Sequence, residues 1–455
     1  MFARPRESLL AIGVLFVLCL ATASARQDFQ DALRPLPGIK YTRPQALTKA
    51  LKPDLKKPVP HHQVLHRQHG SRVNAKSAVA VLGAHQRTLG TGTGGYENIT
   101  SSTAFGTQYA VQVTFGNQPM LVHLDTGSSD TWSVSPDFTC RSAFGEVLPQ
   151  SACRFGPDFA GPFQYGALDP PQHMNLRFGD GEVITGPMGQ TDVTLGNLTV
   201  RHQEVALANN TYWVGDNVTN GVLGLAYASL TNAYAGAQDG DSPSDQVEYN
   251  PLFTNMINQG LCAPVFGMAI ARNASDGMLS FGGVPPVPGL DTSVIASAPI
   301  DVINLIDNPA TADQYSFYTI IPDGFVWNLA SDRTKYPFII DSGTTLNYLP
   351  SELAAIINAA FVPQAELFPD LGAYFVPCNA SAPLFGVTIG GVNLMMNPVD
   401  MVYPGIRDPD KGWCLTAIAN GGAGPYILGD AWLQNVVVVT DVGQSVMHFY
   451  RHVYY

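Results

Sequence analysis

The chain has 455 residues, 45% of them hydrophobic, and a formal net charge of −12 at neutral pH. This length exceeds what one hydrophobic core usually serves, so we expect two domains. From residue 88 onward, ten Lys/Arg stand against 32 Asp/Glu, and this acidic balance argues against nucleic acid as a partner.

The first 25 residues have the organisation of a secretory signal peptide. Arg4 and Arg6 precede an apolar run over 9–20, and Ala23-Ser24-Ala25 follows it as a small-residue exit. About a dozen apolar residues are too few to span a bilayer, and no later segment qualifies. We therefore predict no membrane anchor and a protein that is secreted to the extracellular space or delivered to an acidic vacuolar compartment.

Residues 26–92 are predicted to form a basic propeptide. Over 26–87 there are twelve Lys/Arg and three Asp, together with five of the ten histidines. The opposite charges of this basic leader and of the acidic chain that follows it suggest that the leader binds over the acidic part. Acid would release the leader by protonating the carboxylates to which it is attracted. Charged histidines in the leader would partly oppose that release. A solvated tail that only aids secretion is the alternative.

Strand-like segments predominate in the rest of the chain. They are rich in Val, Ile, Thr and aromatic residues and are separated by Gly and Asn-Gly breaks. They lie at 109–116, 120–125, 189–200, 266–272, 277–284, 337–343, 385–391, 434–443 and 445–450. Helical patterns are clearest at 252–261 and 351–361, and residues 232–246 are predicted to be an exposed loop. A Pro-rich stretch at 285–293 marks the predicted domain boundary.

Two motifs repeat at a separation of 216 positions (341 − 125). Each is an apolar strand that ends in Asp, a hydroxyl residue and Gly, at Asp125 and at Asp341. An apolar pair and Gly follow in each half, at 222–224 and 427–429. A single such triplet would be read as a turn aspartate, but the matched set indicates a duplication with one acid per half. Two facing carboxylates can share one proton and act as base and acid on a water molecule.

From about Tyr96 to Tyr455 the chain resembles the fungal-type, pepsin-like aspartic endopeptidases, whose signature is a pair of such loops. The resemblance implies an all-β, bilobal acid protease fold, in which two pseudo-symmetric β-rich lobes, 93–286 and 287–455, flank an active-site cleft. It implies Asp125 and Asp341 as the catalytic residues, with no cofactor and no metal. The expected protein is a monomer that cleaves protein or peptide substrates in acid, with a preference for bulky apolar residues.

The residues beside the acids match the supporting residues of the family. Gly127 and Gly343 would let the backbone turn sharply and direct amide donors toward the carboxylates. Ser128 and Thr344 match the hydroxyl residues that hydrogen-bond the outer carboxylate oxygens. For either hydroxyl alone, ordinary turn capping would explain the residue.

The family places a hairpin flap over its cleft, usually with the sequence Tyr-Gly-x-Gly. The best match here is Phe178, Gly179 and Asp180, with Phe in place of Tyr. The family's tyrosine hydrogen-bonds a tryptophan that matches Trp132. Because Phe178 lacks this hydroxyl, we predict that the flap is held less firmly and that the turnover number is lower. Tyr165 also precedes a glycine, but its spacing fits less well.

A second departure from the family is His123, two residues before Asp125. The family usually has an apolar residue here, against the substrate side chain that precedes the cleaved bond. His123 could therefore give the pocket for that substrate side chain a preference for polar or acidic residues. Alternatively, it could be a packed, hydrogen-bonded residue at the rim of the pocket. Ile339, two residues before Asp341, is the apolar residue that the family usually has at this position.

Of the six cysteines, Cys19 lies in the signal peptide. Secretion suggests the disulfides Cys140–Cys153 and Cys378–Cys414, which match bridged positions in the family. Cys262 is left over and is expected to be a buried apolar residue. N-glycosylation sequons occur at Asn98, Asn197, Asn209, Asn217, Asn273 and Asn379.

By resemblance, the leader is an intramolecular inhibitor that places a lysine near the acids, with Lys76 as one candidate. We expect self-cleavage in acid between about Lys76 and Tyr96, since no dibasic pair lies in that interval. Two other functions fit parts of the sequence. One is a catalytically silent pepsin-like binding or inhibitor protein, and the other is a glycosidase that uses two carboxylates. The intact duplicated motifs disfavour both.

Overall fold

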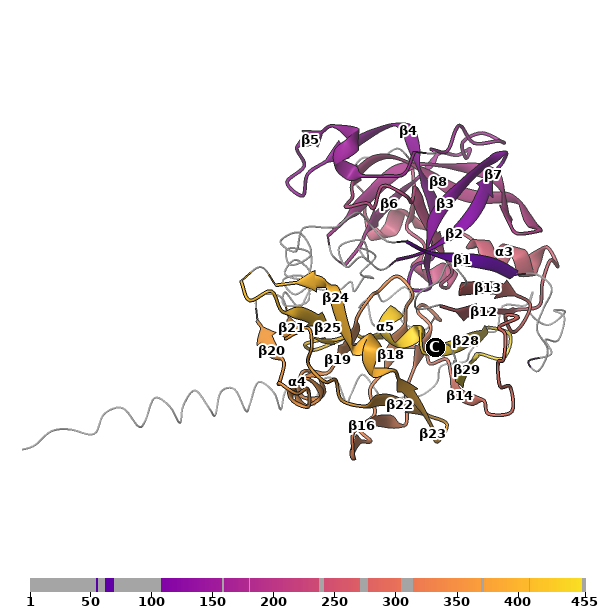
Figure 1. Cartoon of the computed structure of the whole chain (residues 1–455). Helices are drawn as coiled ribbons and strands as arrows, with labels where there is room; N and C mark the ends of the chain where they lie inside the picture. The colour runs from indigo at the N-terminus through magenta and orange to yellow at the C-terminus, as the bar shows by residue number, and fades with distance from the viewer. Residues whose placement is uncertain are drawn as a thin grey trace, which may run out of the picture.

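The computed structural model describes residue 55, the backbone of 62–68 and residues 108–451, except 158, 180, 237–240, 271–276, 304–313, 370–371 and 409. The predicted signal peptide, Lys76 and the interval in which we expect cleavage lie outside these residues. So do Asp180, Asn98 and Asn273. In the described part, strands predominate, and the predicted all-β, two-lobed class is confirmed (Figure 1).

One large sheet runs through the N-terminal lobe and on into the region between the lobes. Its strand order is β11-β10-β6-β7-β8-β4-β9-β3-β2-β1-β13-β12-β28-β29-β14, with β5 beside β4. The strands are β1 His62–Gln68, β2 Gln108–Phe115, β3 Gln118–Asp125, β4 Thr131–Arg141, β5 Val147–Leu148, β6 Gln172–Arg177, β7 Val183–Leu195, β8 Leu198–Tyr212, β9 Gly221–Gly224, β10 Ala233–Ala235, β11 Gln246–Val247, β12 Val265–Ala269, β13 Gly277–Phe281, β14 Ala296–Pro299, β28 Val436–Asp441 and β29 Val446–Arg451.

Three smaller sheets build the C-terminal lobe, in the orders β15-β18-β27-β19-β26, β17-β16-β22-β23 and β20-β21-β25-β24. Their strands are β15 Thr319–Ile320, β16 Gly324–Trp327, β17 Ala330–Asp332, β18 Phe338–Ile340, β19 Asn347–Leu349, β20 Glu366–Phe368, β21 Ala373–Val376, β22 Phe385–Ile389, β23 Val392–Met396, β24 Val402–Arg407, β25 Cys414–Thr416, β26 Ile418–Asn420 and β27 Tyr426–Leu428.

Helices are short and few in the described residues. The two predicted helices are confirmed as α3, Leu252–Asn258, and α4, Ser351–Ala359. A third, α5 (Asp430–Leu433), was not predicted because its four residues are too short to show a helical period. Four 3-10 turns complete the set, at Gln150–Cys153, Ala228–Leu230, Pro243–Asp245 and Pro398–Met401.

Strand alternation explains how the sequence positions the first acid. On β3, the side chains of Met120, Val122 and Leu124 belong to the main hydrophobic core. Because successive side chains of a strand point to opposite faces, His123 and Asp125 lie together on the other face. The core thus fixes the register of β3, and a slip of one residue would bury both polar side chains in it.

The two lobes are joined through the large sheet. Strands β12 and β13 come from before the predicted boundary at 286/287, whereas β28, β29 and β14 come from after it. They pair directly, for example Gly267 of β12 with Val439 of β28. Figure 1 shows these strands between the indigo-to-magenta upper lobe and the orange-to-yellow lower lobe.

A strand of the basic leader is part of this sheet. Strand β1 pairs antiparallel with β13, from His62↔Ser280 to Leu65↔Gly277, and then with β2, from His66↔Ala110 to Gln68↔Gln108. The hydroxyl of Tyr450 also donates to the carbonyl of Leu55, at 3.0 Å. The leader therefore contributes backbone hydrogen bonds to the sheet that joins the lobes. The basic charge of the leader did not predict this pairing.

The described residues contain two disulfides, Cys140–Cys153 in the N-terminal lobe and Cys378–Cys414 in the C-terminal lobe. Cys262 is a buried free thiol, and burial raises its pKa to about 12. Such a thiol stays protonated, as befits a packed apolar residue. Of the sequon asparagines in the described part, Asn197, Asn217 and Asn379 are exposed and Asn209 is half-buried.

Candidate active site

The duplicated motifs form matching structures around the two acids. Asp125 ends β3, which pairs in parallel with β9 so that Asp125 lies opposite Gly224. Asp341 directly follows β18, which pairs in parallel with β27 so that Ile340 lies opposite Leu428. The apolar-apolar-Gly segments of the sequence are therefore the strands that flank the acids, one in each lobe.

Each carboxylate receives the same two hydrogen bonds. The Gly127 amide donates to Asp125 Oδ1 at 2.8 Å, and the Ser128 hydroxyl donates to Asp125 Oδ2. In the other lobe, the Gly343 amide donates to Asp341 Oδ1 at 2.8 Å, and the Thr344 hydroxyl donates to Asp341 Oδ2 at 2.6 Å.

The two acids face each other closely. A Cβ atom built on Gly343 would lie 2.5 Å from Asp125 Oδ1 and 3.2 Å from Asp341 Oδ1. Only a residue without a side chain fits between these two oxygens. The two carboxyl groups also hydrogen-bond each other, and both side chains are fully buried.

The surroundings give the two acids different affinities for a proton. Burial raises the pKa of Asp125, although hydrogen bonds from Ser128 and Gly127 oppose the rise. Burial and the negative charge of Asp125 together hold the pKa of Asp341 well above its ordinary value. Two such carboxyls titrate as a pair. The pair therefore loses its two protons in separate steps, and the raised pKa of Asp341 makes it the partner that keeps a proton longer.

Two further hydroxyls tie the lobes together directly beside the acids. Thr126 Oγ1 donates to the Ile340 carbonyl and accepts from the Ser342 amide, both at 3.0 Å. Ser342 Oγ likewise donates to the Leu124 carbonyl at 3.0 Å and accepts from the Thr126 amide at 3.2 Å. Sequence reasoning missed this crossed set, although its signal was the hydroxyl residue in the middle of each triplet.

The candidate flap residues belong to an aromatic cluster around Trp213. Phe178, in the turn after β6, packs against Trp213 with ring centroids 5.7 Å apart. Trp132, on β4, packs against the same ring at 5.3 Å. Gly179 is also buried in this turn. Trp213 was missed in the sequence because it lies in no recognisable motif.

The indole of Trp132 lacks the partner that a tyrosine at position 178 was expected to give. Its Nε1 is buried and has no hydrogen-bond acceptor among the described residues. An unsatisfied buried donor costs about 1–3 kcal/mol. The chain therefore has both a Phe at position 178, where the family has Tyr, and a Trp132 N–H group without an acceptor among the described residues.

The residues predicted to flank the cleaved bond are buried in different environments. Ile339 is fully buried on β18, in the main core. His123 is 5% exposed and lies with its ring 6.2 Å from Trp213. Burial lowers the pKa of His123, and the charge of Asp216 partly opposes this.

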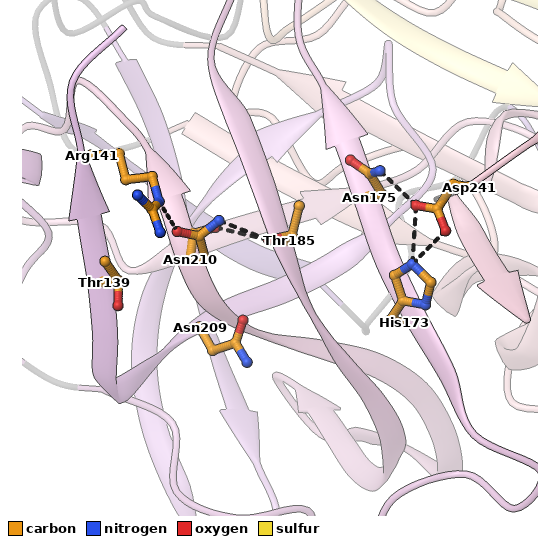
Figure 2. A pocket seen from close by; sticks show the side chains of 8 residues that line it. All are labelled: Thr139, Arg141, His173, Asn175, Thr185, Asn209, Asn210 and Asp241. Carbon is orange, nitrogen blue, oxygen red and sulfur yellow. Dashed lines mark hydrogen bonds and ion pairs between the residues drawn. The ribbon is translucent and has the colours of Figure 1, made fainter. Parts of the chain in front are cut away.

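A polar cavity of about 520 Å³ lies elsewhere in the N-terminal lobe, on strands β4, β6, β7 and β8 (Figure 2). His173 hydrogen-bonds the Gly236 carbonyl and Asp241, both at 3.0 Å, and Asn175 donates to Asp241 at 2.6 Å. These bonds attach the segment after β10 to β6. Across the cavity, Arg141 Nε donates to Asn210 at 2.5 Å. Neither catalytic candidate lines this cavity.

Two searches of the described residues give no site of another kind. No group of three or more His, Cys, Asp or Glu side chains there could hold a metal ion. No helix among the same residues is long and apolar enough to cross a membrane.

The family model described as eukaryotic aspartyl protease matches residues 108–450. A probable aspartic-type endopeptidase of Aspergillus fumigatus is 36% identical to this chain, over 96% of this chain and 98% of the relative. That match necessarily extends into the leader. Aspergillopepsin-1 of Aspergillus flavus is 28% identical over 75% of this chain and 76% of its own length.

A solved structure supports the fold independently of sequence identity. The crystal structure of an aspartic proteinase from Irpex lacteus superposes with a TM-score of 0.57, at 18% identity, over 76% of this chain and 94% of that one. At this identity the likeness concerns the fold alone.

Proposed function

The chain belongs to the eukaryotic aspartyl protease family and is an aspartic-type peptide hydrolase, and we propose that it is made as a secreted zymogen that works in acid. The observation that carries the proposal is the buried carboxyl pair, in which each acid accepts the same amide and hydroxyl hydrogen bonds.

The proposed reaction uses the two acids in different roles. Asp125, the ionised partner, takes a proton from a water molecule, whose oxygen then bonds to the scissile carbonyl carbon. Asp341 keeps its proton and hydrogen-bonds the carbonyl oxygen, which stabilises the charge that develops there. The tetrahedral intermediate collapses when Asp125 passes the proton it took from water to the leaving nitrogen and the C–N bond breaks, which leaves Asp125 ionised again. No covalent acyl-enzyme forms.

The proposed substrates are extended protein or peptide segments with bulky apolar residues around the cleaved bond. The apolar preference rests on the likeness to the family, since Trp132, Phe178 and Trp213 are buried in a core cluster behind the flap turn. An extended peptide can add as a strand beside a hairpin, so that backbone bonds give affinity and side-chain pockets give preference.

The leader is proposed to inhibit the enzyme until acid removes it. Its twelve Lys/Arg in residues 26–87, against three Asp, oppose the acidic body. Strand β1 supports a structural part for the leader as well as an electrostatic one. Secretion to the extracellular space or to an acidic vacuole fits an enzyme that needs acid to lose its leader. We propose that it acts as a monomer.

The dyad is tested by proteolysis of acid-denatured haemoglobin. Wild type and Asp125→Asn would be compared at about pH 3.5, with and without pepstatin, and each protein's fold checked by circular dichroism. We expect activity in wild type alone, abolished by pepstatin, with a loss of roughly a thousand-fold or more in the variant.

An inactive wild type, correctly folded and free of its leader, would contradict the proposed function. It would instead favour the catalytically silent alternative, a protein that binds or inhibits others through the same fold. Activity that survives Asp125→Asn would contradict the assigned acid pair.

A further inference from the structure

A row of short polar side chains crosses four strands of the N-terminal lobe. Asn175 of β6 pairs with Thr185 of β7, and Thr185 pairs with Asn210 of β8. On its other side, Asn210 pairs with Thr139 of β4. Residues that pair across neighbouring strands lie side by side on one face of the sheet. The four side chains therefore form one continuous row, and all four line the polar cavity of about 520 Å³ (Figure 2).

Asn209, the first residue of the sequon Asn209-Asn210-Thr211, faces the same cavity. In a regular strand, Asn209 and Asn210 would point to opposite faces. The pairing of β8 is irregular at this point, because its register shifts between Ala206 and Asn210 against β7 and between Ala208 and Asn210 against β4. Such irregularities redirect side chains, and both asparagines line the cavity. The attachment point for an N-linked sugar is therefore part of the cavity wall.

Two hydrogen-bonded sets of side chains hold the walls of the cavity in place. On one side, Arg141 Nε donates to Asn210 Oδ1, and Asn210 Nδ2 donates to Thr185 Oγ1 at 3.3 Å. On the other side, Asp241 hydrogen-bonds two side chains of β6. Arg141 also donates through Nη1 to the Gly145 carbonyl at 2.9 Å, so two of its five N–H donors are used. The rest of this fixed guanidinium is left to bind oxygen atoms in the cavity.

We propose that Asn209 carries an N-linked glycan whose innermost sugar, an N-acetylglucosamine, lies in this cavity. The inference rests on the secretion proposed above, because such sugars are added in the secretory pathway. Asn209 Nδ2 forms a bond to the anomeric carbon of a lipid pyrophosphate-linked oligosaccharide. The bond between that carbon and the pyrophosphate oxygen breaks, the pyrophosphate keeps the electron pair, and the amide loses one proton to the transferring enzyme. The transfer precedes folding, so the burial of Thr211 in the folded protein does not prevent it.

An N-acetylglucosamine ring suits the cavity in chemistry and in size. Its hydroxyl groups and its acetamide donate and accept hydrogen bonds, and all eight side chains that line the cavity are polar. A volume of about 520 Å³ lies within the roughly 300–1,000 Å³ of pockets that hold small organic ligands. The covalent bond to Asn209 keeps the sugar beside the cavity, so its effective concentration is high and weak hydrogen bonds suffice to hold it there.

The test compares the release of sugars from Asn209 with their release from the exposed sequon residues Asn197 and Asn379. The full chain, secreted from a eukaryotic host, would be treated with peptide N-glycosidase while folded and again after denaturation. Mass spectrometry of its peptides measures each site, because release converts Asn to Asp. We expect release from Asn209 of the folded protein to be at least about ten-fold slower than from the exposed sites. After denaturation the rates should be equal.

A substitution in the cavity wall separates binding in the cavity from simple crowding around Asn209. Arg141→Ala removes the guanidinium and should raise the release rate at Asn209 in the folded protein by about ten-fold. The matched control is Arg201→Ala, at an exposed arginine of the same lobe, which should leave that rate unchanged. Circular dichroism checks the fold of both variants. Protection of Asn209 that is the same in Arg141→Ala as in wild type would overturn the proposal.

A second measurement needs no variant. In wild type with carbon-13-labelled methyl groups, nuclear Overhauser effects should connect the acetyl methyl group of the Asn209-linked sugar to the methyl group of Thr139 or Thr185. Their absence would overturn the proposal.

The pattern of modification distinguishes failure of this inference from failure of the proposed function. Sugars on Asn197 or Asn379 with none on Asn209, or equally fast release from all sites of the folded protein, would overturn this inference alone. A chain without sugar at any sequon would overturn both this inference and the proposed secretion. A glycosylated chain that does not cleave haemoglobin would contradict the peptidase function, while the release rates would still decide where the Asn209 sugar lies.

Discussion

At the scale of single residues, two aspartates with the same neighbours in sequence differ in how firmly they hold a proton. Each accepts one amide and one hydroxyl hydrogen bond. Yet Asp341 has the more strongly raised pKa, because it ionises against a charge already present on Asp125. Duplication provides two like acids, and their proximity separates the two ionisation steps of the pair.

The unpaired indole of Trp132 leads to a prediction for Phe178→Tyr. The new phenol would lie in the same aromatic cluster and offer an acceptor to an indole N–H group, because Trp132 Nε1 and Trp213 Nε1 both lack one among the described residues. We expect a rise of several-fold in kcat and a gain of about 1 kcal/mol in the free energy of unfolding. Steady-state kinetics and urea unfolding measure both.

The control for this substitution is Phe138→Tyr, which adds a hydroxyl to another buried ring of the same cluster. The ring of Phe138 contacts Phe155 and Phe159 and neither indole, so that variant should be neutral or destabilising. If Phe178→Tyr lowers both kcat and stability as much as the control does, Trp132 is not the partner of residue 178.

Functional residues could be predicted from the sequence where they belong to a local motif. They could not be predicted where they depend on a partner that is distant in the sequence. Asp125 and Asp341 stand in repeated triplets, so they were found from sequence. Thr126 and Ser342 stand in the same triplets, but their partners lie 214–218 positions away. Trp213 meets His123, Trp132 and Phe178 only because the fold brings their side chains together, and no spacing rule points to it.

At the scale of elements, the position of β1 determines what the proposed removal of the leader would do to the sheet. The strand lies between β2 and β13, in the interior of the sheet. Its loss leaves two strands with unpaired backbone groups, which are edges in the sense of sheet architecture. Strand-like composition predicted β2 and β13, but the basic, His-rich sequence of 62–68 gave no comparable signal.

A pair of truncations tests the structural contribution of β1. Deletion of 26–61 keeps β1, whereas deletion of 26–68 removes it. We expect the second protein, but not the first, to lose several degrees in Tm at neutral pH, because its sheet lacks one interior strand. Calorimetry compares the two. Equal Tm values would show that β1 contributes nothing to stability.

At the scale of the whole molecule, the raised pKa values of several carboxyl groups predict a fold that is most stable in acid. Burial raises the pKa of Asp125, Asp130 and Asp341, and it raises the pKa of Asp301 to about 6. A folded state with raised acid pKa values binds protons that the unfolded chain has already released. Stability from these groups is therefore full at low pH and is lost as the pH rises through their folded pKa values.

We accordingly expect Tm to fall as the pH rises from about 4 to about 6. Asp301→Asn should flatten the fall by removing one contributor, worth roughly 1 kcal/mol after allowance for its partial exposure. Asp291→Asn is the control. Hydrogen bonds from Ser293 lower the pKa of Asp291, so its contribution is lost only in stronger acid. A Tm that rises between pH 4 and 6 would contradict the prediction.

The crossed hydroxyls beside the acids also constrain how such a chain can change over generations. Thr126 completes the backbone bonding of the second half, and Ser342 completes that of the first. A substitution of Thr126 would therefore disturb the backbone beside Asp341, and a substitution of Ser342 would disturb the backbone beside Asp125. Two copies that arose from one ancestor are thus free to diverge in their sheets and loops, while at this point any accepted substitution in one copy has to be compatible with the other.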